Sequence, residues 1–303
     1  ICRSDPRKKI ITSSIEHPSI LKSCKFLENR GCQVIYLPVD SYGLIDLQSL
    51  EEALDDEVLL VSIMHANNEI GTVQPIKQIA EMIQKKSLNK KIYFHVDAVQ
   101  TAGKIPIDLS EIPIDLLSLS SHKIYGPKGA GALYIRKKTP LTPLLHGGGQ
   151  EYRRRSSTEN VAAIVGFAKA FEMIQKNPVL KKDLRDYLYT GIQNKIPHIV
   201  RNGHPTKCLD HLLNISFLYI EGESLMLHLD MENICVSTGS ACSSSSLEPS
   251  YVLLALGRSH EEAHGSIRFS LGKNSTKKEI DKVLFALPPI VQKLRNISPL
   301  YFG

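Results

Sequence analysis

The sequence lacks long apolar runs and has no strong excess of one charge. No stretch of its 303 residues reaches the length of a transmembrane helix, and no signal peptide is visible. Its 37 Lys and Arg against 31 Asp and Glu give a net charge of +6, and the basic residues are scattered apart from a run at residues 153–155. We therefore expect no membrane association, no direct nucleic-acid binding and a cytoplasmic location.

Cysteine spacing typical of a metal site is also absent. The six cysteines form no CxxC pair and no other zinc-type spacing, so we expect no metal ligands. In a reducing cytoplasm, most of them would serve as small buried side chains. They are Cys2, Cys24, Cys32, Cys208, Cys235 and Cys242.

Apolar strands alternate with helical stretches through the first half of the chain. A composition of 42% hydrophobic and 22% charged residues is that of a globular protein with a large core. The pattern predicts strands at residues 9–14, 33–38, 58–64, 91–96, 114–119 and 130–136, and helices at 19–30, 46–54 and 75–86. This alternation favours an α/β fold with a mostly parallel, doubly wound sheet, which we assign to a large domain at residues 1–179.

The pattern changes after Pro140. A glycine-rich loop and a helix at residues 159–174 lead into a smaller α+β domain at residues 180–303. We expect its strands at residues 212–217, 234–236 and 266–270, and its helices at 184–196, 223–231, 249–256 and 277–294.

Lys123 follows the apolar run at residues 114–119, which predicts a short buried strand. A Gly-Pro-Lys-Gly turn comes next, so the lysine projects from the carboxyl edge of the sheet, where open α/β folds bind ligands. A desolvated amine at this edge loses its proton more easily and can form a Schiff base. The alternative is an ordinary surface lysine before a turn.

Polar residues also follow the neighbouring strands. They are Asn67, Asn68, Asp97, Gln100, Ser120 and His122. Because the carboxyl ends of parallel strands share one edge, we expect these side chains to converge. Asp97 suits the carboxylate that keeps the pyridine nitrogen of pyridoxal 5′-phosphate (PLP) protonated, and Gln100 could reach the ring oxygen. The alternatives are a helix N-cap for Asp97 and a solvent-facing helix position for Gln100.

Three further residues have two readings each. His17, after the first strand, could stack on a cofactor ring and move protons, or it could be structural. Cys242 lies in a segment, residues 237–246, that contains only Ser, Thr, Gly, Ala and Cys and predicts a mobile loop. It is either an exposed nucleophile or an incidental cysteine in a linker. Arg268 could bind a substrate carboxylate bidentately or be a surface strand residue.

Taken together, these motifs resemble the cysteine desulfurases, the NifS/IscS-like family of fold-type I, class-V aminotransferase-like PLP enzymes. The matching stretches run in family order over nearly the whole chain. They are TSSIEH at 12–17, MHANNEIG at 64–71, HVDAVQ at 95–100, SLSSHKIYGPKG at 118–129, HGGGQE at 146–151, RSSTEN at 155–160, STGSAC at 237–242, LEPSY at 247–251 and IRFSLG at 267–272.

The resemblance implies a role for each site residue. Lys123 would bind PLP covalently and move the Cα proton, His17 would stack on the ring, and Asp97 would pair with its nitrogen. Cofactor-binding roles also fall to Asn68, Gln100, Ser120, His122 and Thr158. Arg268, with Asn68, would bind the carboxylate of the substrate L-cysteine.

The same resemblance implies the reaction and its partners. Cys242 would take the sulfur as a persulfide and leave L-alanine. The sulfur would then pass to an iron–sulfur scaffold or another acceptor, for cluster assembly or thiolation. Thr158 would reach the phosphate of the neighbouring subunit, because the family forms homodimers.

Two departures from the family pattern keep alternatives open. The family begins with a segment bearing a phosphate-binding loop that this sequence lacks, and Ser157 replaces the usual glycine before the threonine. The alternatives are a selenocysteine lyase or another class-V PLP enzyme that does not need Cys242, and a truncated inactive chain.

Overall fold

The computed structural model describes residues 5–87, 89–239 and 248–301 of the chain. Its residues fall into two compact units. Unit 1 comprises residues 1–38, 45–65 and 74–178, and unit 2 comprises residues 39–44, 66–73 and 179–303. Two short segments from the first half of the sequence, residues 39–44 and 66–73, therefore belong to unit 2. The expected domains were two contiguous ranges, which cannot describe this arrangement.

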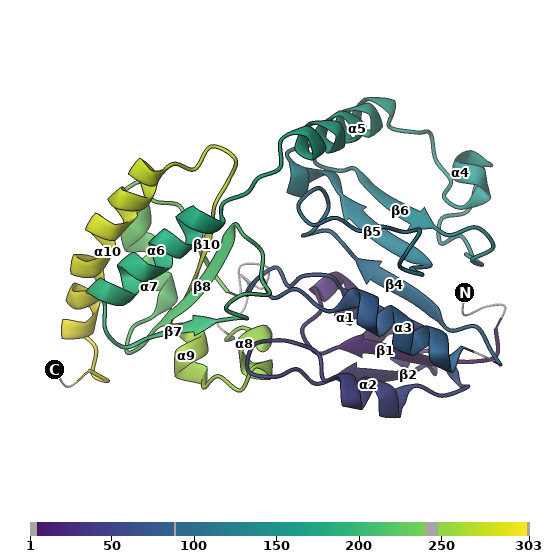
Figure 1. Cartoon of the computed structure of the whole chain (residues 1–303), viewed down its shortest axis with the longest axis horizontal. Coiled ribbons are helices and arrows are strands. Elements are labelled where there is room, and N and C mark those ends of the chain that lie inside the picture. The colour runs from purple at the N-terminus through teal and green to yellow at the C-terminus, as the bar shows by residue number, and fades with distance from the viewer. Residues whose placement is uncertain (1–4, 88, 240–247, 302–303) are drawn as a thin grey trace. The chain divides into compact units, whose positions relative to one another are not determined.

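Unit 1 is built on a six-stranded sheet in the order β2-β1-β3-β4-β5-β6. The strands are β1 (Lys9–Ser13), β2 (Gln33–Leu37), β3 (Val58–Met64), β4 (Tyr93–Asp97), β5 (Leu116–Ser120) and β6 (Gly131–Ile135). Neighbouring strands from β2 to β5 pair in parallel, and β6 pairs antiparallel with β5. The expected α/β fold with a mostly parallel sheet is confirmed (Figure 1).

Several helices of unit 1 begin at a residue whose side chain caps the first turn. They are α1 (Pro18–Glu28), α2 (Leu47–Ala53), α3 (Ile76–Lys86), the 3-10 helix η1 (Ser121–Ile124), α4 (Gln150–Arg153) and α5 (Val161–Lys176). Asp46 caps α2, since its carboxylate accepts the Gln48 N–H at 3.0 Å. Asn160 caps α5 in the same way through the Ala163 N–H.

A buried polar ladder crosses the middle of this sheet. Both ring nitrogens of His95 on β4 lie 2.8 Å from a serine hydroxyl, Ser62 on β3 and Ser118 on β5. Burial lowers the pKa of His95 to about 4, so the ring is neutral at pH 7. The ladder satisfies the polar atoms that β4 buries two residues before Asp97.

Unit 2 has a four-stranded sheet in the order β7-β8-β10-β9. Its strands are β7 (Ile199–Asn202), β8 (Leu212–Phe217), β9 (Ser237–Thr238) and β10 (Ser266–Ser270), and its helices are α6 (Lys182–Lys195), α7 (Gly222–Met231), α8 (Tyr251–Ala255), α9 (His260–His264) and α10 (Lys277–Asn296). Figure 1 shows α6, α7 and α10 together against this sheet, and their apolar side chains form one core with β8 and β10.

The strand expected at residues 234–236 is wrong. Those residues are irregular, and the strand is β9 at the next two positions. Ser237 and Thr238 pair with β10 through their backbone. The strand therefore forms at two polar residues and not at the apolar Cys235 and Val236 that precede them. The expected loop therefore does not begin at Ser237, and its residues 240–247 lie outside the described residues.

No helix within the described residues is long and apolar enough to cross a bilayer. In those same ranges, no group of three or more His, Cys, Asp or Glu side chains could hold a metal ion.

Candidate active site

The carboxyl ends of β1, β4 and β5 bring three of the expected residues together in unit 1. His17 follows β1, Asp97 ends β4, and Lys123 lies in η1 directly after β5. Burial lowers the imidazole pKa of His17, the charge of Asp97 raises it, and the charge of Lys123 lowers it. This edge of the sheet therefore holds an acid, a base and an amine within electrostatic range of one another.

Asp97 is the buried carboxylate of this group, with 9% of its surface exposed. Burial raises the pKa of Asp97, while a hydrogen bond from the Val99 N–H at 2.9 Å and the neighbouring His17 lower it. The chain after Asp97 makes turns and no α-helix, so Asp97 is not a helix N-cap. Asp97 instead holds the turn after β4 through the Val99 N–H, and its carboxylate faces a buried environment that favours a cationic partner.

His17 has a structural role as well as its place at the site. Its Nδ1 accepts the Ser19 N–H at 3.2 Å and lies 2.9 Å from the Ser19 hydroxyl, so His17 is the N-cap of α1. Burial lowers the pKa of His17. Since Nδ1 accepts a backbone N–H, the neutral ring carries its proton on Nε2.

Lys123 lies in a turn fixed at both ends. Ser121 N–H donates to the Ala130 carbonyl, and Tyr125 closes η1 with a left-handed backbone, φ 65°. The Lys123 side chain is exposed, as is His122, whose Nδ1 lies 2.9 Å from the Ser120 hydroxyl. Burial lowers the pKa of His122, and the charges of Lys123 and Lys128 lower it further. These effects favour the neutral form of the His122 ring.

Two further expected cofactor residues of unit 1 lie outside its helices and strands. Gln100 is half-buried in the turn after β4. Thr158 is exposed between α4 and α5, and no hydrogen bond or charge interaction joins it to Lys123 within the described ranges. Ser157, just before it, has φ 122°, a region that favours glycine.

Asn68 and Arg268 meet in unit 2. Arg268 on β10 donates through Nη1 to the Asn68 carbonyl at 2.9 Å. Two atoms beside this bond are buried without a partner among the described residues, the Arg268 Nε donor and the Asn68 Oδ1 acceptor. Buried polar atoms in this state favour a ligand that supplies the missing partners.

Cys242 lies outside the described residues, so its position is not part of this geometry. The expectation that most cysteines are buried is wrong for those that are described. Cys24 is buried, Cys32 and Cys208 are partly buried, and Cys235 is exposed after α7. Among the described residues, Cys235 is therefore an exposed cysteine that the sequence did not single out.

Three charged residues near these groups were not found from the sequence. Glu16 is fully buried next to His17, where Oε1 accepts the Ser13 hydroxyl at 2.6 Å and the Met64 N–H at 2.9 Å. Burial, then the charge of Lys123, lowers the pKa of Lys104 to about 8. Glu69 is buried in unit 2 beside Asn68. Glu16 and Glu69 lie within the motifs at 12–17 and 64–71, and Lys104 lies four residues after the motif at 95–100, but burial of a charge leaves no periodic pattern that would have singled them out.

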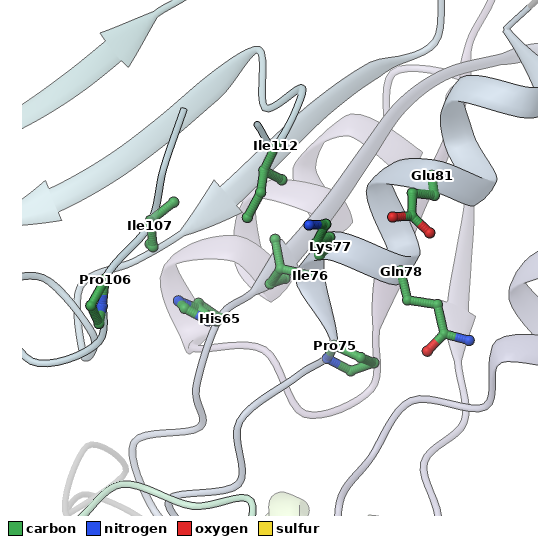
Figure 2. Close-up of a pocket in the computed structure, with 9 residues that line it drawn as sticks. All are labelled: His65, Pro75, Ile76, Lys77, Gln78, Glu81, Pro106, Ile107 and Ile112. Atoms are coloured by element: carbon green, nitrogen blue, oxygen red, sulfur yellow. The ribbon is translucent and has the colours of Figure 1, made fainter. Parts of the chain in front are cut away.

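A separate pocket of unit 1 lies at the N-terminus of α3 (Figure 2). Its lining includes His65, Pro75, Lys77 and Ile112, and it contains none of His17, Asp97 or Lys123. His65 is held there by Thr101, 3.0 Å from its Nδ1, and burial lowers its pKa to about 4. This pocket is not the site that the motifs predict.

Comparisons with known proteins agree on one family. The aminotransferase class-V family model matches residues 3–283. A cysteine desulfurase IscS of Methanosarcina thermophila is 54% identical over 301 residues, covering 98% of this chain and 73% of that protein. A cysteine desulfurase IscS of Dictyoglomus turgidum is 50% identical over 296 residues, covering 96% of this chain and 74% of that protein. The chain thus spans about three quarters of the length of these relatives.

Solved structures give the same answer for the fold. A NifS-like protein matches with a TM-score of 0.88 and 39% identity, covering 97% of this chain and 78% of the other. A NifS-like protein from Rickettsia africae matches with a TM-score of 0.84 and 32% identity, covering 96% and 77%. The expected fold type I architecture is confirmed, and the chain belongs to the class-V aminotransferase family, among its cysteine desulfurases.

Proposed function

We propose that this chain is a PLP-dependent cysteine desulfurase that removes sulfur from L-cysteine and leaves L-alanine. The observation that carries the proposal is the meeting of His17, Asp97 and Lys123 at the carboxyl edge of one sheet. A buried carboxylate, an imidazole and an amine are the three side-chain types that PLP chemistry requires. Family membership supports the same reaction.

The residues present fit PLP on two counts. Asp97 is buried with one described hydrogen-bond donor, the Val99 N–H, so it can accept the pyridine N–H of the cofactor. Lys123 would hold PLP through Nζ. Phosphate and ring-oxygen contacts are proposed for Asn68, Gln100, Ser120, His122 and Thr158. When bound, PLP supplies an electron sink for charge that develops at the substrate carbon.

The chain's own groups divide the remaining work. His17 carries its neutral-state proton on Nε2, because Nδ1 accepts from Ser19, so Nε2 is the atom that can donate. Lys123 moves the Cα proton of the substrate. Arg268 and Asn68 are proposed to bind its carboxylate, a role supported by the unpartnered Nε donor.

Sulfur transfer is assigned to Cys242. Its thiolate would attack the substrate sulfur, forming an S–S bond while the bond from sulfur to Cβ breaks. The carbon then takes a proton to complete alanine, and Cys242 is left as a persulfide. An iron–sulfur scaffold or another acceptor protein would receive the sulfur.

We also propose a homodimer that works in the cytoplasm. Val161, Ile164 and Val165 form an apolar face on α5 and are 47–65% exposed, which favours a second copy as cover. Thr158 precedes this face and would reach the partner's cofactor phosphate.

The test is incubation of the full chain with PLP and L-cysteine, with alanine and the protein persulfide both measured. We expect equimolar products in the first turnover, a PLP absorbance band that Lys123→Ala abolishes, and no persulfide in Cys242→Ala. Cys235→Ala is the matched control, because it removes an exposed thiol from the same unit and should leave the reaction unchanged. Alanine production that survives Cys242→Ala, or persulfide found on Cys235, would contradict the assignment.

A further inference from the structure

Glu69 is a buried carboxylate that the proposed chemistry does not use. It belongs to the segment 66–73 of unit 2 and is 5% exposed. Its N–H donates to the Asn67 side chain at 2.8 Å, and its carbonyl accepts the Asn214 side-chain amide at 3.0 Å. These two hydrogen bonds hold the Glu69 backbone in place.

The carboxyl group points at the residue that begins α8. Ser250 donates its hydroxyl to Glu69 Oε2 at 2.5 Å, across 181 positions of sequence. Ser250 is 3% exposed, and the same hydroxyl caps α8 by accepting the Leu253 N–H at 3.3 Å. The contact therefore fixes where the chain enters α8.

The same oxygen also lies against Gly239. A Cβ placed on Gly239 would be 3.2 Å from Glu69 Oε2 and 3.1 Å from the Ser266 hydroxyl, so a side chain there would press on the carboxylate. Gly239 and Ser250 stand on either side of residues 240–249, which include Cys242. One buried oxygen thus accepts a hydrogen bond from Ser250 at one end of the segment that carries the proposed nucleophile and leaves no room for a side chain at Gly239, its other end.

Arg268 links this carboxylate to the proposed substrate contact. Burial raises the pKa of Glu69, whereas Ser250 and the charge of Arg268 lower it, and the result is about 7. Arg268 also donates to the carbonyl of Asn68, the residue next to Glu69. The carboxylate is thereby coupled to the group proposed to bind the substrate.

We propose that Glu69 is a positioning residue for sulfur transfer, which sets both ends of the Cys242 segment in register with Arg268. The inference rests on the proposed function and deepens it. Its physical basis is that transfer requires the thiolate to meet the substrate sulfur repeatedly in one geometry, and a misplacement of about 1 Å can cost about 100-fold in rate. We assign Glu69 no contact with substrate or cofactor, so we expect the main effect of its replacement in the transfer step.

The experiment follows single-turnover persulfide formation on Cys242 in the PLP-loaded full chain, by alkylation and mass spectrometry at saturating L-cysteine. Glu69→Ala and Ser250→Ala should each slow transfer about tenfold, and the double variant should be no slower than the slower single, because both changes break one contact. Glu69→Gln keeps an acceptor for Ser250 and should retain most of the rate. The matched control is Glu248→Gln, which changes an exposed carboxylate in the same segment and should match the wild type.

Two further readouts separate positioning from a purely structural role. The PLP band and the KM for cysteine should stay at wild-type values in Ser250→Ala and Glu69→Gln. The proposal is overturned if Glu69→Ala transfers at the wild-type rate, or if the PLP band and the thermal midpoint fall in step with transfer. Should Glu69→Ala not fold, Ser250→Ala and Glu69→Gln decide. Absence of transfer in the PLP-loaded wild type would defeat the proposed function and this inference together, whereas wild-type rates in all variants would defeat this inference alone.

Discussion

Glu16 and Asp97 are two buried carboxyl groups at the same edge of the sheet, and the charge of Asp97 adds to burial in raising the pKa of Glu16 to about 8. The Ser13 and Met64 hydrogen bonds to Glu16 act in the opposite direction and are outweighed. At pH 7 Glu16 is therefore mostly protonated and adds little negative charge beside Asp97.

Glu16→Gln should change how stability depends on pH. The ordinary pKa of a glutamate is 4.5 and the folded value is about 8, so between these values the folded chain holds a proton that the unfolded chain has lost. Folding stability then falls as pH rises through this window, by up to about 1.4 kcal/mol per pH unit. Glutamine removes that dependence, so the variant gains on the wild type from pH 5 to pH 8.

Denaturant unfolding at pH 5, 6.5 and 8 measures this difference. Glu51→Gln, at an exposed position of α2, is the control and should follow the wild type. Equal slopes for wild type and Glu16→Gln would show that the Glu16 carboxyl titrates as if it were in water.

Ser157→Gly should stabilise unit 1. Ser157 has φ 122°, where a side chain is strained and glycine is not, so we expect a gain of about 1 kcal/mol in unfolding free energy. Ser156→Gly is the control, because the Ser156 hydroxyl donates to the Gly148 carbonyl at 2.9 Å and its loss should destabilise. Thermal unfolding of both variants checks the prediction, which a lower midpoint for Ser157→Gly would contradict.

Arg295→Met should destabilise unit 2 without touching the proposed chemistry. Arg295 is 1% exposed and donates to the carbonyls of Pro197, His198 and Leu218 at 2.8–3.2 Å. Removing the donors leaves three carbonyls short of partners, which should cost about 2–4 kcal/mol.

The control is Lys293→Met, two residues earlier on an exposed face of α10, which should be nearly neutral. Denaturant titration gives the free energies. The PLP band of folded Arg295→Met should equal that of the wild type, and its loss in native buffer would show that Arg295 does more than hold carbonyls.

Val165→Glu should weaken the proposed homodimer. Val165 is 60% exposed beside Val161 on α5, and burying a carboxylate at an interface should raise the dimer Kd by about 100-fold. Sedimentation equilibrium of the PLP-loaded chain measures the constant. Phe285→Glu, at an 83% exposed apolar position of α10, is the control. A wild type that is monomeric at micromolar concentration would contradict the dimer.

The elements that could be predicted from sequence are those whose own residues determine them. β3, β8 and β10 have the expected bounds because β3 and β8 are largely apolar runs and β10 alternates polar with apolar residues. β7, with Arg201 and Asn202, has no such run and was missed, and β9 was displaced because β10 pairs with serine and threonine. The positions of these short strands depend on pairing with strands that are distant in the sequence, and no local residue pattern indicates that pairing.

The same limit applies to the candidate site. Strand ends placed His17, Asp97 and Lys123 correctly at one edge, since parallel strands share that edge. The contacts that hold unit 2 join residues far apart in sequence, such as Ser250 to Glu69 and Arg268 to Asn68. A glutamate beside an asparagine gives no sign that its partner lies 181 positions away. The roles of the site residues stay predictions that the experiments above address.

The chain passes between its two units after Pro38, Leu44, His65, Val73 and Pro178, and this has a consequence for its synthesis. A ribosome releases residues 39–44 and 66–73 long before it makes the strands that they accompany. Until β8 and β10 emerge, the polar groups of residues 66–73 lack Asn214 and Arg268, and a nascent chain stalled after unit 1 would expose them to chaperones and proteases. The order of translation thus makes the native contacts of residues 66–73 wait for the last strand of unit 2.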